Sequence, residues 1–281
     1  MQNNDWLRAE DYAEPRCLLC DEPHGAKPKA KSVPLQRVLA KFDEYTSRDD
    51  PAGAERHMLY WLEEARLGGD LRGQFQIRNE LMGLYRKTAQ KDKAFASMES
   101  ALALARELGI EEQTGGATAF LNAATVLCAF DEAERSLPLF EHARAVYEKN
   151  LPADDPRMGG LYNNMALTLT SLGRYGEADD LFRRALGVMA GAPNGALEQA
   201  ITYLNMADAA YAQFGSEADG QINEYLETAL GLLEDETLER NGYYAFVCEK
   251  CAPIFTYFGW SDYGNDLEER AERLYAANRV N

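Results

Sequence analysis

The sequence has few of the residues that build metal centres and disulfide frameworks. Its 281 residues include 3 histidines and 5 cysteines. Three histidines are too few for a histidine-rich metal site, and an odd number of cysteines in a long chain does not suggest a disulfide framework. The motifs of phosphate loops, dinucleotide folds, zinc proteases, nucleophile elbows and EF-hands are also missing. We therefore expect a protein without catalytic activity and without a cofactor.

Long apolar runs and an excess of positive charge are missing as well. No apolar run reaches the roughly 18 residues that a membrane-spanning helix needs. The first residues lack the basic region and apolar core of a secretory signal, so we expect a cytoplasmic protein. The chain has 29 Lys and Arg against 46 Asp and Glu, a formal net charge of −17. This charge repels nucleic acid and anionic membranes, so we expect neither as a partner.

The acidic charge is unevenly spread along the chain. Residues 196–240 contain 10 Asp and Glu but 1 Lys or Arg, whereas residues 60–106 contain 8 Lys and Arg and 6 Asp and Glu. An extended ligand could therefore meet a positive end and a negative end. The alternative is that these charges only solvate outer faces.

The chain does contain a repeat of about 42 residues. Phe140 and Phe182 lie 42 residues apart, and so do Ala143 and Ala185. Four asparagines, which we call the asparagine ladder, follow at intervals of 43, 42 and 41 residues: Asn79, Asn122, Asn164 and Asn205. A period in this range is typical of a solenoid built from helical hairpins.

The clearest copy spans residues 161–186. Its first half has apolar residues at helical spacing: Leu161, Met165, Leu169 and Leu172. Gly173 is placed to end this helix in a left-handed conformation. The second half alternates small and large residues at Ala178, Phe182 and Ala185, which lets two antiparallel helices interlock closely. Neither helix can bury its apolar stripe alone, so neighbouring copies must stack.

At these residues the chain resembles the tetratricopeptide repeat, especially the longer form in kinesin light chains and their bacterial relatives. The likeness is sharpest from the linker at 154–156, through the start of the first helix at 162–166, to the turn at 173–175. It covers about residues 35–281, most strongly 72–234. The resemblance implies an all-α, right-handed superhelical solenoid of about six helix pairs, in which the first helices line a concave groove that binds peptides.

We divide the chain on this basis into a lead-in and a solenoid. Residues 1–34 are rich in proline and lysine and read as an irregular segment. The six expected units cover residues 35–68, 71–109, 113–150, 156–191, 196–234 and 238–277. The spacing predicts a helix over residues 35–47, followed by a helix that Asp50 caps and Pro51 begins. The fifth unit holds extra residues around 215–220.

The asparagine ladder is the best candidate binding site. Asparagine is a poor residue inside a helix, so one in each first helix calls for a partner. The resemblance implies that these asparagines hold a peptide main chain on the concave face. Tyr162 and Arg78 lie close to the ladder and are weaker candidates for contacts with ligand side chains. The alternative is that each asparagine bonds a neighbouring repeat and stiffens the stack.

The cysteines suggest a rival reading. Cys17, Cys20 and His24 in the lead-in and the pair Cys248 and Cys251 could together hold a structural zinc ion. Cys248 and Cys251 would equally serve as small core residues of a first helix. A third reading is a self-associating structural protein, a homo-oligomer.

The last unit is unusually rich in aromatic residues. They are Tyr243, Tyr244, Phe246, Phe255, Tyr257, Phe258 and Trp260. Such density either covers the open end of the core or offers a platform to a ligand.

Overall fold

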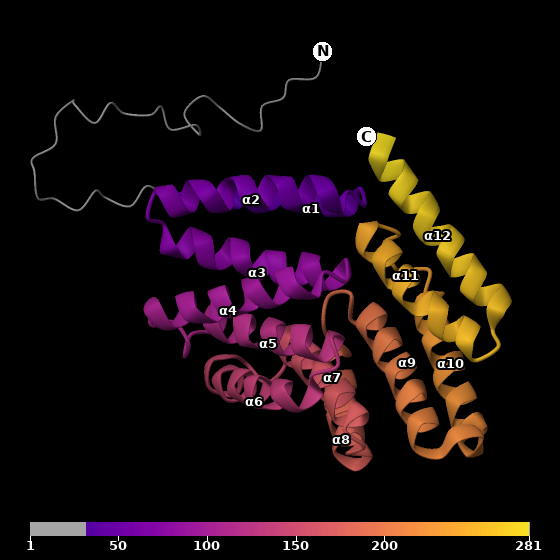
Figure 1. Cartoon of the computed structure of the whole chain (residues 1–281). Coiled ribbons are helices and arrows are strands. Elements are labelled where there is room, and N and C mark those ends of the chain that lie inside the picture. The colour runs from indigo at the N-terminus through magenta and orange to yellow at the C-terminus, as the bar shows by residue number, and fades with distance from the viewer. Residues whose placement is uncertain (1–31, 281) are drawn as a thin grey trace, which may run out of the picture. The chain divides into compact units, whose positions relative to one another are not determined.

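The computed structural model describes residues 32–280, and within them every regular element is helical. The chain divides into two compact units, Met1–Gly109 and Ile110–Asn281. The first unit contains two helical hairpins (Figure 1): α1 (Leu35–Ser47) with α2 (Pro51–Leu67), and α3 (Leu71–Lys87) with α4 (Lys91–Glu107). No helix of the described residues has both the length and the apolar character needed to cross a membrane.

The caps of the first unit follow from its sequence. The helix expected over Leu35–Ser47 is confirmed, as is the start of α2 at Pro51. Asp50 accepts a hydrogen bond at Oδ1 from the Gly53 N–H at 2.8 Å. Asp70 caps α3 in the same way, with its Oδ1 2.9 Å from the Gly73 nitrogen. Each carboxylate thus satisfies one of the N–H groups that a helix start leaves without a partner.

The second unit contains four further hairpins. They are α5 (Thr114–Ala129) with α6 (Ala133–Asn150), α7 (Pro156–Ser171) with α8 (Tyr175–Met189), α9 (Gly195–Phe214) with α10 (Asp219–Leu233), and α11 (Gly242–Tyr257) with α12 (Ser261–Val280). Gly173 adopts a φ of +72° just after α7, as its place in the repeat predicts. The expected all-α architecture of about six pairs is confirmed, whereas the exact bounds of the repeat units remain our interpretation.

In the third and fourth hairpins, small buried side chains surround one large buried ring. Phe140 in α6 and Phe182 in α8 are fully buried at equivalent positions. Ala143 and Ala185, one turn further along each helix, are buried too, and so is Ala166 on α7. The small side chains let the helices approach, and the phenyl rings fill the space between them.

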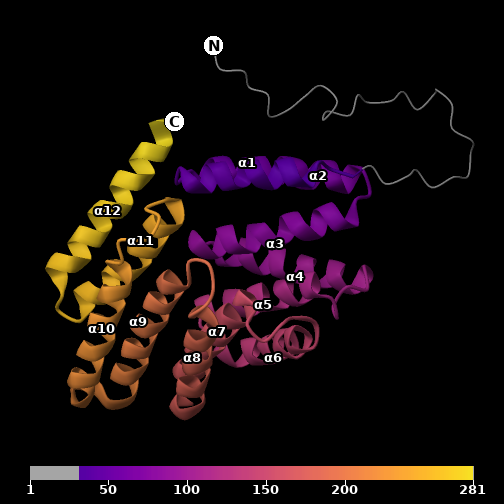
Figure 2. The ribbon, with the colours of Figure 1, turned by 180° about the vertical axis from the view of Figure 1, so that it is seen from behind.

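Within the second unit the helices form two layers (Figures 1 and 2). The first helices α5, α7, α9 and α11 contact one another in succession, whereas the second helices α6, α8, α10 and α12 lie farther apart. A stack whose elements are closer on one side curves toward that side. The first helices therefore form the concave side of this unit, which we call the inner layer.

The fifth hairpin is irregular, as expected. The helix α9 runs for 20 residues and is followed by a short 3-10 turn, Gly215–Ala218, in which Gly215 has a φ of +58°. The insertion stretches the repeat, since Ala185 and Ala229 lie 44 residues apart instead of 42.

Candidate functional site

The four ladder asparagines all lie on first helices. Asn79 is on α3 in the first unit, and Asn122, Asn164 and Asn205 are on α5, α7 and α9 in the second. The last three therefore belong to the inner layer. Their environments differ, so the ladder is not a row of equivalent groups.

Asn205 bonds a neighbouring repeat. Its side-chain nitrogen donates a hydrogen bond to the Oδ1 atom of Asn163 on α7 at 3.0 Å, and the residue is 7% exposed. The two residues are 42 residues apart, one full repeat. At this position the side-chain amide joins two neighbouring repeats, as in the alternative in which the asparagines bond the stack and not a ligand.

Asn164 is the most available member of the ladder. It is half-buried, and among the described residues its side chain has no hydrogen-bond partner, although its carbonyl oxygen accepts a bond from Thr168 Oγ1 at 3.1 Å. Asn79 and Asn122 are also half-buried, but both already interact with other groups of the chain. A ligand would therefore meet an unengaged amide at Asn164.

The two candidates beside the ladder differ in exposure. Tyr162 is 8% exposed, and the Arg184 guanidinium lies 6.0 Å from the centre of its ring. Little of Tyr162 is left for a ligand to touch. Arg78 on α3 is half-buried. Nothing in the structure tests whether either residue binds a ligand, so both remain predictions.

The aromatic residues of the last hairpin are divided between the core and the surface. Tyr244 and Phe255 are fully buried in the core of the second unit. Phe246 and Tyr257 remain exposed on α11, and Tyr257 is 63% exposed. Some rings thus fill the end of the core, while others are available at the surface.

The exposed rings of α11 meet α9 along the inner layer. The ring centre of Tyr211 on α9 lies 5.8 Å from those of Tyr257 and Phe258, in edge-to-face arrangements. Tyr257 and Phe258 are themselves edge to face at 5.0 Å. Asp208 precedes Tyr211 by one turn of α9, and its charge acts on the Tyr257 hydroxyl. We call these four residues, Asp208, Tyr211, Tyr257 and Phe258, the Asp208 patch.

Two carboxyl groups of α9 have unusual environments. Asp208 is exposed to solvent, yet the protein atoms around it displace enough water to raise the pKa of its carboxyl to about 6. Burial also raises the pKa of Glu198, whose carboxylate accepts a hydrogen bond from the Tyr243 hydroxyl on α11. The positive charge of Lys250 partly offsets the effect at Glu198, whereas no such cation acts on Asp208.

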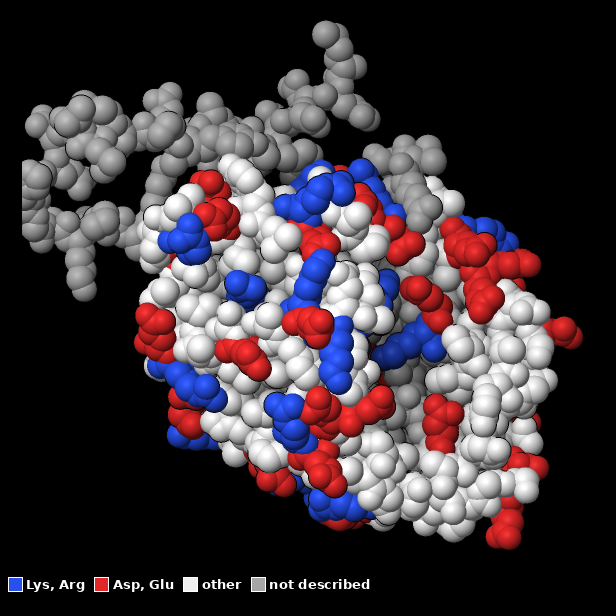
Figure 3. Space-filling model, viewed as in Figure 1, with Lys and Arg blue, Asp and Glu red and all other residues white. Residues whose placement is uncertain are grey.

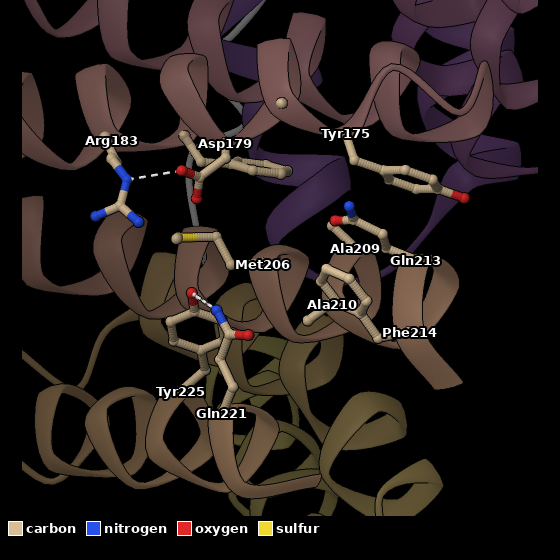
Figure 4. Close-up of a pocket in the computed structure, with 12 residues that line it drawn as sticks. Tyr175, Asp179, Arg183, Met206, Ala209, Ala210, Gln213, Phe214, Gln221 and Tyr225 are labelled. Carbon is tan, nitrogen blue, oxygen red and sulfur yellow. Dashed lines mark hydrogen bonds and ion pairs between the residues drawn. The ribbon is translucent and has the colours of Figure 1, made fainter. Parts of the chain in front are cut away.

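A pocket of about 280 Å³ opens where the fifth hairpin is irregular (Figure 4). Phe182 from α8, Met206 from α9 and Tyr225 from α10 are among the residues that line it. Two of its polar pairs are already satisfied: Arg183 Nε donates to Asp179 at 2.8 Å, and Gln221 donates to the Tyr225 hydroxyl at 2.7 Å. The pocket lies between α8, α9 and α10, so one wall of it is formed by α9, a helix of the inner layer.

A second hollow, of about 370 Å³, contains three arginines, Arg240, Arg270 and Arg273. Arg270 is already neutralised, because its guanidinium donates to Glu234 at 2.7 Å and forms an ion pair with Asp266 at 2.5 Å. Arg240 lies over the Tyr244 ring at 4.1 Å. This network joins the C-terminal end of α10 and the start of α11 to the middle of α12.

The cysteines of α11 are core residues. Cys248 and Cys251 are fully buried, and burial raises the pKa of the Cys251 thiol to about 12. Zinc binds thiolates, so this environment disfavours metal ligation by Cys251. Cys17, Cys20 and His24 lie outside the described residues, and within the described residues no three His, Cys, Asp or Glu side chains gather as they would around a metal ion.

Cys248 and Cys251 are expected to resist alkylation by iodoacetamide in the folded protein. The thiolate is the reactive form, and burial both excludes the reagent and disfavours that form. Mass spectrometry of the peptides that carry these residues, after labelling in buffer and in concentrated urea, measures the difference. Rapid labelling of both thiols without urea would contradict their place in the core.

Comparison with known proteins gives one family match. Residues 117–157 and 160–189 match the tetratricopeptide repeat family. This stretch contains α5 to α8, with Asn122 and Asn164 at its two first helices. The resemblance drawn from the repeat spacing is therefore confirmed. No curated protein matches the chain.

Several solved structures are similar to this chain. One contains the nearly identical TPR-like repeats of a protein described as a kinesin light chain from Podosopora anserina, with 16% identity and a TM-score of 0.50 over 74% of this chain and 98% of that chain. Another is BtubC (BKLC) from P. vanneervenii, with 16% identity and a TM-score of 0.47 over 88% of this chain and 92% of that chain. At this identity the first likeness shows the fold alone, an all-α tetratricopeptide solenoid.

Proposed function

We propose that this chain, with its tetratricopeptide repeats of the kinesin light chain type, is a non-catalytic scaffold that binds an extended peptide or a helix of a partner protein along its inner layer. Tetratricopeptide repeats generally serve as protein-interaction scaffolds, which makes a protein partner the natural expectation. The cytoplasmic location and the lack of nucleic-acid, membrane and cofactor binding remain predictions from the sequence.

One observation carries the proposal. In the second unit, the exposed large apolar side chains all lie on first helices: Leu167 on α7, Tyr211 and Phe214 on α9, and Phe246 and Tyr257 on α11. On the second helices of this unit, the described leucine, isoleucine, valine, methionine, phenylalanine and tyrosine side chains are all buried or half-buried. Exposed apolar surface that gathers on one layer, rather than being scattered, marks an interaction surface.

The asparagine ladder would fix the position of a peptide main chain along this surface. An asparagine amide can donate to a peptide carbonyl and accept from the next peptide N–H. Asn164 and Asn122, which keep part of their surface exposed on neighbouring first helices, are the strongest candidates for this role. Asn79, Asn205, Arg78 and Tyr162 are proposed as additional contacts, and the inter-repeat bond of Asn205 limits what it can offer.

The test is a pulldown from a random peptide library with the wild-type chain and the Asn122→Ala, Asn164→Ala double variant. Each amide that bonds a peptide main chain is worth about 1 kcal/mol, so the double variant should bind captured peptides about 30-fold more weakly. Fluorescence polarisation with the captured peptides measures the ratio.

A matched control is Asn265→Ala, which removes the same group from the exposed side of the second helix α12. This variant should keep the wild-type affinity. Equal capture by the double variant and the wild type would show that the ladder is structural, and a double variant that melts well below the wild type would point the same way.

A further inference from the structure

The fifth hairpin carries negative charge with no positive charge of its own. Residues 185–239 contain no Lys or Arg, so α9 and α10 are without a basic side chain. Over α10, the charged atoms on the face seen in Figure 3 are those of Asp and Glu. Any cation that neutralises this hairpin must come from another helix or from a ligand.

Asp208 is one of the carboxylates of this hairpin that lack such a cation among the described residues. Among the described residues it forms no ion pair and no hydrogen bond, and its side chain is exposed to solvent, where a ligand can reach it. Lys250, the cation on the facing side of α11, acts on Glu198 and lies 6.0 Å from the Phe246 ring. Asp208 is thus an exposed carboxylate, mostly ionised at neutral pH and without a counter-charge among the described residues.

The aromatic rings beside Asp208 are also suited to a cationic ligand group. Tyr211 is 42% exposed, and it meets Tyr257 and Phe258 edge to face, which leaves ring surface open to solvent. The face of an aromatic ring attracts an ammonium or guanidinium group. A carboxylate and exposed rings at one place therefore complement a side chain with an apolar stem and a positive end.

We propose that the Asp208 patch binds a lysine or arginine side chain of the peptide that occupies the inner layer. The inference rests on the proposed function and deepens it. The asparagines can read only the main chain of a ligand, whereas the patch would select one side chain by charge. The cationic end would pair with Asp208 while the stem lies against Tyr211 and Tyr257.

The test uses four immobilised libraries of nonapeptides that are random except for a central Lys, Arg, norleucine or Glu. Norleucine keeps the length of the lysine stem and removes its charge. The wild-type chain is expected to retain the Lys and Arg libraries about tenfold better than the norleucine library, the size of a partly desolvated ion pair with a ring contact. Asp208→Asn should remove this preference, and Tyr257→Ala should reduce it.

The matched control is Glu227→Gln, which makes the same change of charge on the exposed side of α10 and should leave the preference intact. Retention without a preference for Lys and Arg, or a preference that survives in Asp208→Asn, overturns the inference. If that retention still depends on Asn122 and Asn164, the proposed function stands. Retention of no library overturns both. Self-association of the wild type that Asp208→Asn abolishes would make a second copy the occupant and would also overturn the inference.

Discussion

The Phe182→Ala variant is expected to lose about 3–5 kcal/mol of unfolding free energy, the usual cost of removing a fully buried phenyl ring. Phe182 is 1% exposed and packs between the small residues of its own hairpin. The loss combines the transfer energy of the ring with the cavity left behind, because helices held by alanine contacts cannot collapse into the space. Urea unfolding followed by circular dichroism measures the change.

Two further variants show whether burial is the cause. Phe140→Ala removes the equivalent ring one repeat earlier and should cost a similar amount, whereas Phe214→Ala removes a ring that is 50% exposed and should cost far less. A loss below about 1 kcal/mol for Phe182→Ala would contradict the packing described here. Because each hairpin contacts its neighbours, a weakened fourth hairpin should lower the cooperativity of the whole second unit.

The Asp70→Ala variant is expected to destabilise the first unit by about 2–3 kcal/mol. Asp70 is buried, and besides capping α3 through the Gly73 N–H it accepts a second hydrogen bond at Oδ2 from the Val33 N–H at 2.9 Å. The carboxylate thereby ties the chain before α1 to the start of α3. Its removal leaves two backbone donors without their partner.

Asp50 provides the matched control for Asp70. It caps α2 through the Gly53 N–H alone, so Asp50→Ala should cost about 1 kcal/mol. The difference between the two variants gives the contribution of the bond to Val33, and thermal melts of both measure it. Equal losses would show that this second bond adds nothing to stability.

Most of the fold could be predicted from the sequence because the repeat gives the same information several times. The spacing of Phe140 and Phe182 located two hairpins at once, and Gly173 marked the turn between two helices. The capping residue Asp50 then located the start of the second helix at Pro51. The bond between Asp70 and Val33 could not be predicted, because it depends on three-dimensional proximity that no local sequence pattern contains.

The candidate site could be predicted only in part. Spacing paired Asn205 with Asn164 at 41 residues, whereas the structure pairs it with Asn163 at 42. The shift of one residue turns an expected ligand contact into a bond between repeats. The Asp208 patch was missed altogether, although the stretch without Lys or Arg and the aromatic last unit were both visible signals. The stacking of the fifth and sixth units was expected, but no sequence pattern showed that Asp208 and Tyr211 of α9 would lie beside Tyr257 of α11.

The bond between Asn163 and Asn205 also constrains how this sequence can evolve. The donor and the acceptor are both amides, and replacing either alone leaves the other half-buried or buried with nothing to bond. Substitutions at these two sites are therefore coupled: drift at one selects for a compensating change at the other. The side chain of Asn164 makes no such bond among the described residues, so a substitution there leaves no buried amide without a partner. The adjacent positions Asn163 and Asn164 are therefore under different selection.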